Sequence, residues 1–273
     1  MHDKLTSLGD AVSAIQDGMR VAFGGNTLHR GPCAVVHEIV RQGRRGLEIV
    51  KTAGAYEVDL LAGTGSASSA SCGFVGFETV FGLAPSYRRA VERGDVEAKE
   101  HACYTVIAGL RAAIQGVPFM PVAGMFGSDV LAARGFQTVR DPYSGKEVVA
   151  APALIPDVAV IHVQEADREG NARIAGSRFE DVLMAKAARH VIITAERIVD
   201  GGEFEAVPEQ VAIPGFMVAA VVDAPGGAWP TSCLGYYDYD TGYLADYVAA
   251  SKDADRLQAF VTQRILAPQM VGA

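Results

Sequence analysis

Apolar and polar residues follow one another along this chain in blocks typical of strand–helix–strand units. Residues 19–23 form a short apolar run, Pro32 suits the first turn of a helix, and residues 47–50 form the next apolar run. The helix between these runs has one apolar face, made of Val35, Val36, Ile39 and Val40. Its other face holds His37, Glu38, Arg41 and Gln42. A helix with one apolar stripe is expected to pack on a sheet.

The same alternation continues to the end of the chain. It predicts further strands at residues 117–122, 157–163, 191–194 and 217–222, helices at 100–115 and 180–189, and closing helices within 244–265. The small, polar segment 63–71 reads as a loop. The pattern predicts an α/β fold, a single domain over residues 1–273 with a mainly parallel, doubly wound sheet and flanking helices.

Composition and charge narrow the function classes. The 273 residues carry a net charge of −8 with no basic excess, which argues against nucleic acid as a partner. No apolar run approaches the roughly 20 residues that span a bilayer, and the first residues have no signal-peptide core, so we expect a cytoplasmic protein without a membrane partner. The four cysteines are far apart and are expected to be reduced thiols.

The stretch VAFGGNTLHRGP, residues 21–32, is the most suggestive motif. A strand that ends in Gly24-Gly25 and turns into a helix presents backbone N–H groups at the sheet edge where α/β proteins bind ligands. The lysine of a phosphate loop is missing here, and the later segment 63–68 lacks the third glycine of a dinucleotide fingerprint. A tight turn without a ligand remains an equal alternative.

Other candidate groups are scattered. Glu100-His101 is interpreted as a solvated helix start, and His162 as a structural histidine inside an apolar strand. The acidic residues of QEADREGN, 164–171, favour a turn at Gly170 over a metal site, and no metal is predicted. Neither Ser128 nor Cys103 has a neighbouring base in the sequence. From these residues alone, the chain is an α/β ligand-binding enzyme without an evident catalytic centre.

Five ordered segments, read together, resemble the A (α) subunit of family I coenzyme A-transferases, in particular that of glutaconate CoA-transferase. The likeness runs from Leu5 to about Phe260. The segments are FGGNTLHRGP, GLAPSYRRAVERG, GVPFMPVAGMFGSD, VAVIHVQEADREGNARIAG and APGGAWPTSCLGYYDYD.

The resemblance implies transfer of CoA from an acyl-CoA to a small carboxylate, with dicarboxylic acyl groups among the candidates and no permanently bound cofactor. In that family the thioester is attacked by a glutamate of the B (β) subunit. The only Glu-Gly pair here, Glu169-Gly170, matches the turn motif of the A subunit, so no catalytic residue is expected in this chain. The residues implied in binding CoA or the acyl group are Gly24, Gly25, Asn26, Arg30, Gly127 and Ser128. A surface role for Arg30 remains open.

Two departures from the family pattern leave alternatives. Trp229 stands where A subunits usually carry histidine, which leaves the substrate open. A related steroid-ring-cleaving hydrolase subunit carries a catalytic acid at a position that aligns with Cys103, so a hydrolase would need Glu100 in that role. A non-catalytic effector-binding domain is a third alternative, although no helix-turn-helix or basic segment precedes the domain.

Overall fold

The computed structural model describes residues 2–267 and contains one large sheet. Its strand order is β11-β10-β8-β1-β2-β3-β4, and all of these strands are parallel. Short β9 (Ala172–Arg173) pairs antiparallel with β8. The expected mainly parallel, doubly wound sheet is thereby confirmed. The strands are β1 (Arg20–Phe23), β2 (Leu47–Gly54), β3 (Ala67–Val75), β4 (Glu97–Glu100), β8 (Val158–Ala166), β10 (His190–Ile198) and β11 (Ala220–Asp223).

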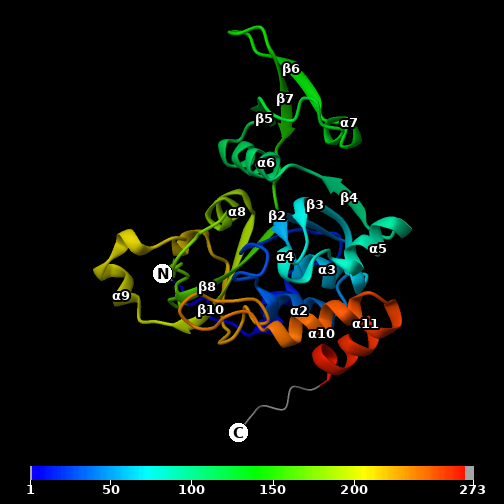
Figure 1. Cartoon of the computed structure of the whole chain (residues 1–273). Coiled ribbons are helices and arrows are strands. Elements are labelled where there is room, and N and C mark those ends of the chain that lie inside the picture. Colours follow the sequence, from blue (N-terminus) through cyan, green and yellow to red (C-terminus); the bar gives the residue numbers. More distant parts are fainter. Residues whose placement is uncertain (1, 268–273) are drawn as a thin grey trace.

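Helices cover both faces of this sheet (Figure 1). One face is covered by α1 (Leu8–Ser13), α2 (Cys33–Arg41), α3 (Tyr56–Gly63), α5 (Pro85–Arg93), α10 (Thr241–Ser251) and α11 (Ala254–Val261). The other is covered by α6 (Cys103–Gln115) and α8 (Asp181–Ala187). Short α4 (Glu78–Phe81) follows β3, and short α9 (Gly201–Ala206) follows β10 at the edge of the molecule (Figure 1). Burial on both faces explains why the central strands are continuous runs of Val, Ile and Ala.

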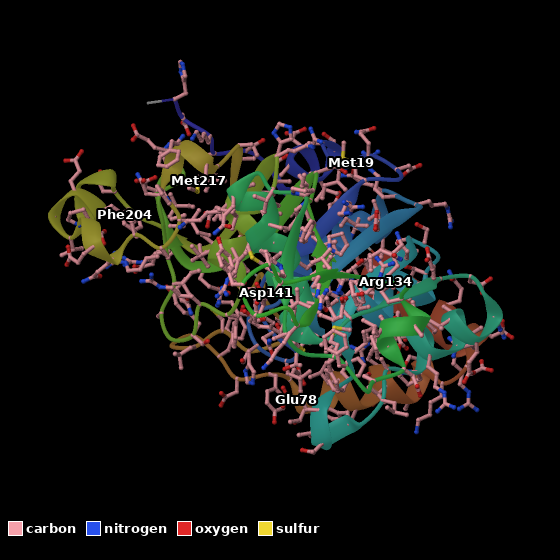
Figure 2. The ribbon with its side chains drawn as sticks, turned by 90° about the horizontal axis from the view of Figure 1, so that it is seen from above. Met19, Glu78, Arg134, Asp141, Phe204 and Met217 are labelled. Atoms are coloured by element: carbon pink, nitrogen blue, oxygen red, sulfur yellow. The ribbon has the colours of Figure 1, made fainter. Side chains whose placement is uncertain are left out.

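A small antiparallel sheet stands out from the body on the far side of α6 (Figure 1). It consists of β5 (Phe119–Val122), β7 (Glu147–Pro152) and β6 (Gln137–Arg140), with α7 (Val130–Ala133) beside it. Figure 2 looks down on this unit, with Asp141 near its tip. The strand expected at 117–122 therefore exists, but it belongs to this unit and not to the main sheet.

Three other sequence expectations were wrong. Residues 67–71 are the start of buried β3, not a loop, because small side chains let α6 approach: a Cβ at Gly73 would lie 2.4 Å from the Cys103 nitrogen. The helix expected from residue 100 begins at Cys103, since Glu97–Glu100 is a strand. His37, expected on the polar face of α2, is buried and hydrogen-bonds the Tyr56 hydroxyl at 2.8 Å.

Within residues 2–267, the helices are all too short or too polar to cross a membrane. The four cysteines are free thiols, as expected.

Candidate functional site

The main sheet changes direction between β1 and β8. From β1 the chain adds β2, β3 and β4 on one side, whereas β8, β10 and β11 extend the other side. Parallel sheets bind ligands in the crevice outside the carboxyl ends of the strands at such a point. Gly24 and Gly25 directly follow β1, so the glycine motif found in the sequence lies at this crevice.

The amides of this loop are already engaged within the chain. Gly24 N–H donates to the Val160 carbonyl at 2.8 Å, and Asn26 N–H donates to the His29 carbonyl at 2.9 Å. Gly25 N–H donates to Asp181 Oδ1 at 2.8 Å. Internal acceptors therefore use the same N–H groups that the sequence analysis assigns to a ligand, and the role of these amides in binding stays a prediction.

Glycine at position 25 is required by the backbone. Its φ is +74°, and an added Cβ would lie 2.4 Å from the Arg30 carbonyl oxygen. At Gly24 an added Cβ would lie 2.9 Å from Asp181 Oδ1. The loop folds back tightly on itself and on α8, and only glycine permits this approach.

Arg30 is buried, which excludes the surface position that the sequence analysis left open. Its guanidinium donates to Asp181 Oδ2 at 2.6 Å and to the backbone carbonyls of His162 and Ser177 at 2.8 and 2.9 Å. The guanidinium also lies 5.7 Å from the ring centroid of Phe179. The carboxylate that Arg30 contacts in this structure is thus Asp181 of the same chain. This pair ties the loop between β1 and α2, residues 24–31, here called the glycine loop, to α8.

Backbone strain gathers around the crevice. Among the described residues, five non-glycine residues have positive φ: Thr27, Arg30, Glu78, Met125 and Phe179. Thr27 and Arg30 belong to the glycine loop, Phe179 packs on Arg30, and Glu78 accepts a hydrogen bond from the Thr27 hydroxyl. Strained residues of this kind concentrate at functional sites, where the surrounding structure holds them in place.

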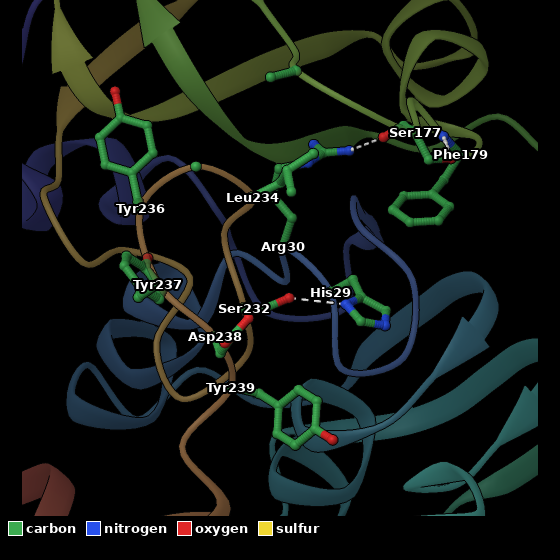
Figure 3. Close-up of a pocket in the computed structure, with 12 residues that line it drawn as sticks. His29, Arg30, Ser177, Phe179, Ser232, Leu234, Tyr236, Tyr237, Asp238 and Tyr239 are labelled. Carbon is green, nitrogen blue, oxygen red and sulfur yellow. Dashed lines mark hydrogen bonds between the residues drawn. The ribbon is translucent and has the colours of Figure 1, made fainter.

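A pocket of about 500 Å³ opens beside the Arg30–Asp181 pair (Figure 3). Its volume lies in the range of small-molecule sites. His29 and Phe179 lie on one side, and the loop 232–239 forms the other. His29 Nδ1 lies 2.8 Å from the Ser232 hydroxyl, and the His29 and Tyr239 rings are 6.5 Å apart. The lining residues are His29, Arg30, Ala175, Ser177, Phe179, Ser232, Leu234, Gly235, Tyr236, Tyr237, Asp238 and Tyr239.

Buried Glu196 supports the loop wall of this pocket. It accepts hydrogen bonds from the Tyr237 hydroxyl and from Gly226 N–H, the latter at 2.7 Å, and its carboxylate lies 2.8 Å from His162 Nε2. Burial alone would raise the pKa of Glu196, but the hydrogen bonds from His162 and Tyr237 outweigh it and hold the pKa below its ordinary value. Glu196 therefore ties Tyr237 of the loop wall to Gly226 and to His162 of β8.

His162 is the satisfied structural histidine that the sequence indicated. Its Nδ1 lies 2.8 Å from the Thr194 hydroxyl, and burial lowers its pKa. His162, Glu196 and Cys233 lie close enough together to suggest a metal site, with ligand atoms within 4.8 Å of one another. However, both imidazole nitrogens already have protein partners, so hydrogen bonding accounts for the cluster.

The expected turn after β8 is confirmed. Asp167 accepts hydrogen bonds from the backbone N–H groups of Glu169 and Asn171, and Gly170 has a φ of +97°. The turn positions β9 beside β8 and leads into the loop that carries Ser177 and Phe179.

The remaining sequence candidates do not line the pocket. Gly127 and Ser128 lie in the loop after β5, where the Ser128 hydroxyl accepts from Val130 N–H. Trp229 packs on Tyr243 with ring centroids 4.3 Å apart and donates to Asp240, so the residue at the position of the family histidine does not line this pocket.

Glu100 and Cys103 lie on opposite faces of the sheet. The Cys103 backbone and Sγ lie against Gly73 on the α6 face. Glu100 pairs with Cys72, the next residue to Gly73, and lines a hollow with residues of α5. Because neighbouring strand residues point to opposite faces, Glu100 cannot take the place of Cys103. His101 is also buried, against Phe136, and is not part of a solvated helix start.

The pocket contains residues that the sequence analysis missed. Ser177, Phe179, Ser232, Leu234 and Tyr239 come from loops far from the glycine motif. The one sequence signal for this wall is the aromatic run YYDYD, 236–240, because clustered tyrosines can form the wall of a binding site.

Comparisons with known proteins decide the family. Residues 5–224 match the Coenzyme A transferase family. This chain belongs to that family. It is 34% identical to the A subunit of glutaconate CoA-transferase from Acidaminococcus fermentans, over 94% of this chain and 86% of that protein. The crystal structure of that transferase superimposes with a TM-score of 0.93 at 33% identity, covering 96% of this chain and 89% of the other.

Two further relatives widen the picture. The cholesterol ring-cleaving hydrolase IpdA subunit of Rhodococcus jostii is 34% identical over 95% of this chain and 91% of its own length. An uncharacterized protein of Archaeoglobus fulgidus is 37% identical over 92% of this chain, but the match spans only 57% of that protein. Membership of the family confirms that the chain is an enzyme, a CoA-transferase of the A-subunit type. It disfavours the alternative of a non-catalytic effector-binding domain.

Proposed function

We propose that this chain is the A subunit of a heteromeric CoA-transferase that moves CoA from an acyl-CoA to a small carboxylate. A B subunit would supply the glutamate on which the glutamyl-CoA thioester forms. The observation that carries the proposal is the state of the acids at the crevice. Asp181 and Glu196 are buried and already accept hydrogen bonds, and the only acid among the described lining residues is exposed Asp238.

In the proposed reaction, the partner's carboxylate attacks the thioester carbonyl and CoA leaves as the thiolate. The thiolate then attacks the glutamyl carbonyl of the anhydride, which releases the first carboxylate and leaves glutamyl-CoA. The acceptor carboxylate reverses these two steps, so atoms and charges balance. This chain would hold the acyl group in the pocket, where the His29–Ser232 pair can hydrogen-bond it.

The partner would dock beside the pocket, over the rim formed by the end of β3 and α4. Phe74, Val80 and Leu83 expose large apolar side chains there, 45%, 54% and 64% exposed, and the hydrogen bond between Thr27 and Glu78 links this rim to the glycine loop. Contiguous apolar surface next to an incomplete site is typical of a subunit interface, and a stable one buries more than about 2,000 Å².

Co-expression with a B subunit tests the proposal. We expect the two chains to co-purify at fixed stoichiometry, CoA transfer only from the complex, and a hydroxylamine- or borohydride-sensitive thioester on the partner's glutamate. Transfer by the pure single chain would contradict the proposal. So would separate elution of the two chains at micromolar concentration.

One observation favours acyl-CoA hydrolysis as a second candidate function. The Ser232 hydroxyl lies 2.8 Å from His29 Nδ1 inside the pocket, a pairing that can activate a hydroxyl. No acid is hydrogen-bonded to this imidazole among the described residues, which weakens the dyad. Ser232→Ala separates the functions: a hydrolase would lose its turnover, whereas a transferase would keep its partner-bound thioester.

A further inference from the structure

We propose that this pocket selects acyl groups with an uncharged, apolar tail over acyl groups that end in a second carboxylate. The inference rests on the proposed function, because it takes the pocket as the acyl site. It also changes the expectation drawn from the family resemblance, which included dicarboxylic acyl groups.

Much of the pocket lining is hydrocarbon and aromatic surface. Phe179, Leu234 and Tyr239 surround the open space (Figure 3). Ala175 adds a methyl group to the lining. Leu234 is 64% exposed although it is a large aliphatic residue, so it offers apolar surface that a ligand can cover. Covering such surface favours each additional methylene of a ligand by about fourfold in affinity.

The pocket offers no unpaired cation to a second carboxylate. Arg30 is the one arginine or lysine among its described lining residues, and its charge is opposed by Asp181 at 2.6 Å. Its guanidinium also donates to two backbone carbonyls, those of His162 and Ser177. Asp238 adds a negative charge to the lining. A carboxylate placed here would lose water without gaining a counter-ion, which is unfavourable.

Arg178 is a cation outside the pocket that could still bind a second carboxylate of the acyl group. It lies between Ser177 and Phe179 and is exposed, but it does not line the pocket. If Arg178 bound the tail of a dicarboxylic acyl group, its removal would change the acyl preference. Arg178→Ala is therefore the matched test of a cation supplied from outside the pocket.

Pentanoyl-CoA and glutaryl-CoA form a matched pair, since they differ only in a terminal methyl or carboxylate group. We would measure their dissociation constants by calorimetry, and kcat/KM with acetate as acceptor, on the assembled two-subunit complex at about pH 8. We expect pentanoyl-CoA to be favoured by at least about tenfold, and hexanoyl-CoA by a further fourfold. Equal or tighter binding of glutaryl-CoA would overturn the proposal, as would a change of preference in Arg178→Ala.

Leu234→Lys places a cation in the exposed part of the pocket lining and should raise the glutaryl-to-pentanoyl ratio by about threefold to fivefold. Leu234→Met keeps the apolar surface and should leave the ratio unchanged. If Leu234→Lys instead breaks the complex while Leu234→Met does not, the pocket is a subunit contact and the proposal is wrong. The binding preference is measured without turnover, so a complex that binds pentanoyl-CoA but transfers no CoA would contradict the proposed function alone.

Discussion

Replacing Asp181 by asparagine should destabilise the chain strongly, although the substitution changes one side-chain atom. Asp181 is fully buried, accepts from Gly25 N–H at 2.8 Å and lies 2.6 Å from Arg30 Nη1. Asparagine can keep the first hydrogen bond through its amide oxygen. It cannot keep the second interaction, because its amide carries no charge and leaves the Arg30 guanidinium buried without a counter-ion.

The magnitude follows from this geometry. Removing one partner of a buried ion pair costs about 3 to 5 kcal/mol. Arg30 retains two backbone carbonyls as acceptors, so we expect the lower end, about 3 kcal/mol. For a chain of 273 residues this corresponds to a fall of about 6 to 12 °C in Tm.

Trp229 provides the assay, because it is the single tryptophan and packs against Tyr243. Its fluorescence during urea unfolding gives the free energy of unfolding for each variant. Glu92→Gln is the matched control: it breaks a 2.8 Å ion pair with Arg88 whose side chains are 60% and 63% exposed, and should cost less than about 1 kcal/mol. If Asp181→Asn costs no more than this control, buried charge does not hold the crevice together.

Three further outcomes are expected. Gly25→Ala should cost more than about 2 kcal/mol in urea unfolding because its Cβ meets the Arg30 backbone, whereas Gly18→Ala, also at positive φ but in open space, should cost about 1 kcal/mol; equal losses would contradict the close-approach argument. Burial raises the pKa of Asp59 from 3.8 to about 6, so its contribution to stability is present near pH 4 and lost as the pH rises through 6. The free energy of unfolding should therefore fall by about 2 to 3 kcal/mol less between pH 4 and 7 in Asp59→Asn than in the unchanged chain. The same pH profile for both proteins would refute the raised pKa of Asp59. Glu196→Gln should raise KM for acyl-CoA in the complex several-fold by loosening the pocket wall, whereas Glu203→Gln, at an exposed residue, should not. Equal KM values for the two variants would show that Glu196 does not support the wall.

Periodicity was a good guide wherever a strand is apolar and a helix has one apolar stripe. The strands around β1, β2, β8 and β10 follow from such runs, because both faces of a central parallel strand are buried. β3 was missed because residues 67–71, where it starts, are only alanine and serine. The small side chains of β3 allow α6 to pack closely against the strand. This contact joins distant residues, so a linear pattern of apolar and polar positions does not reveal it.

The site was only half accessible from the sequence. Gly24-Gly25 can be found as a local motif, since the turn and its tight geometry involve neighbouring residues. The engagement of its amides by Asp181, and the burial of Arg30, depend on residues about 150 positions further along the chain. The pocket lining likewise combines residues from three separate loops, 29–30, 175–179 and 232–239, which come together only in the folded chain.

The position of β8 beside β1 also governs how this chain can be assembled during synthesis. β1 can pair with β2 once residues 20–54 have been made, but its other edge has no partner until β8 has been made. The ion pair of Arg30 can form only after Asp181, 151 residues further along the chain, has been made. The small β5-β7-β6 sheet lies between these partners and pairs only with itself, so it can form from local contacts in the meantime. The crevice can therefore close only after α8 has been made, and nascent chains that end before α8 carry an open strand edge and an unopposed guanidinium, features that favour mispairing.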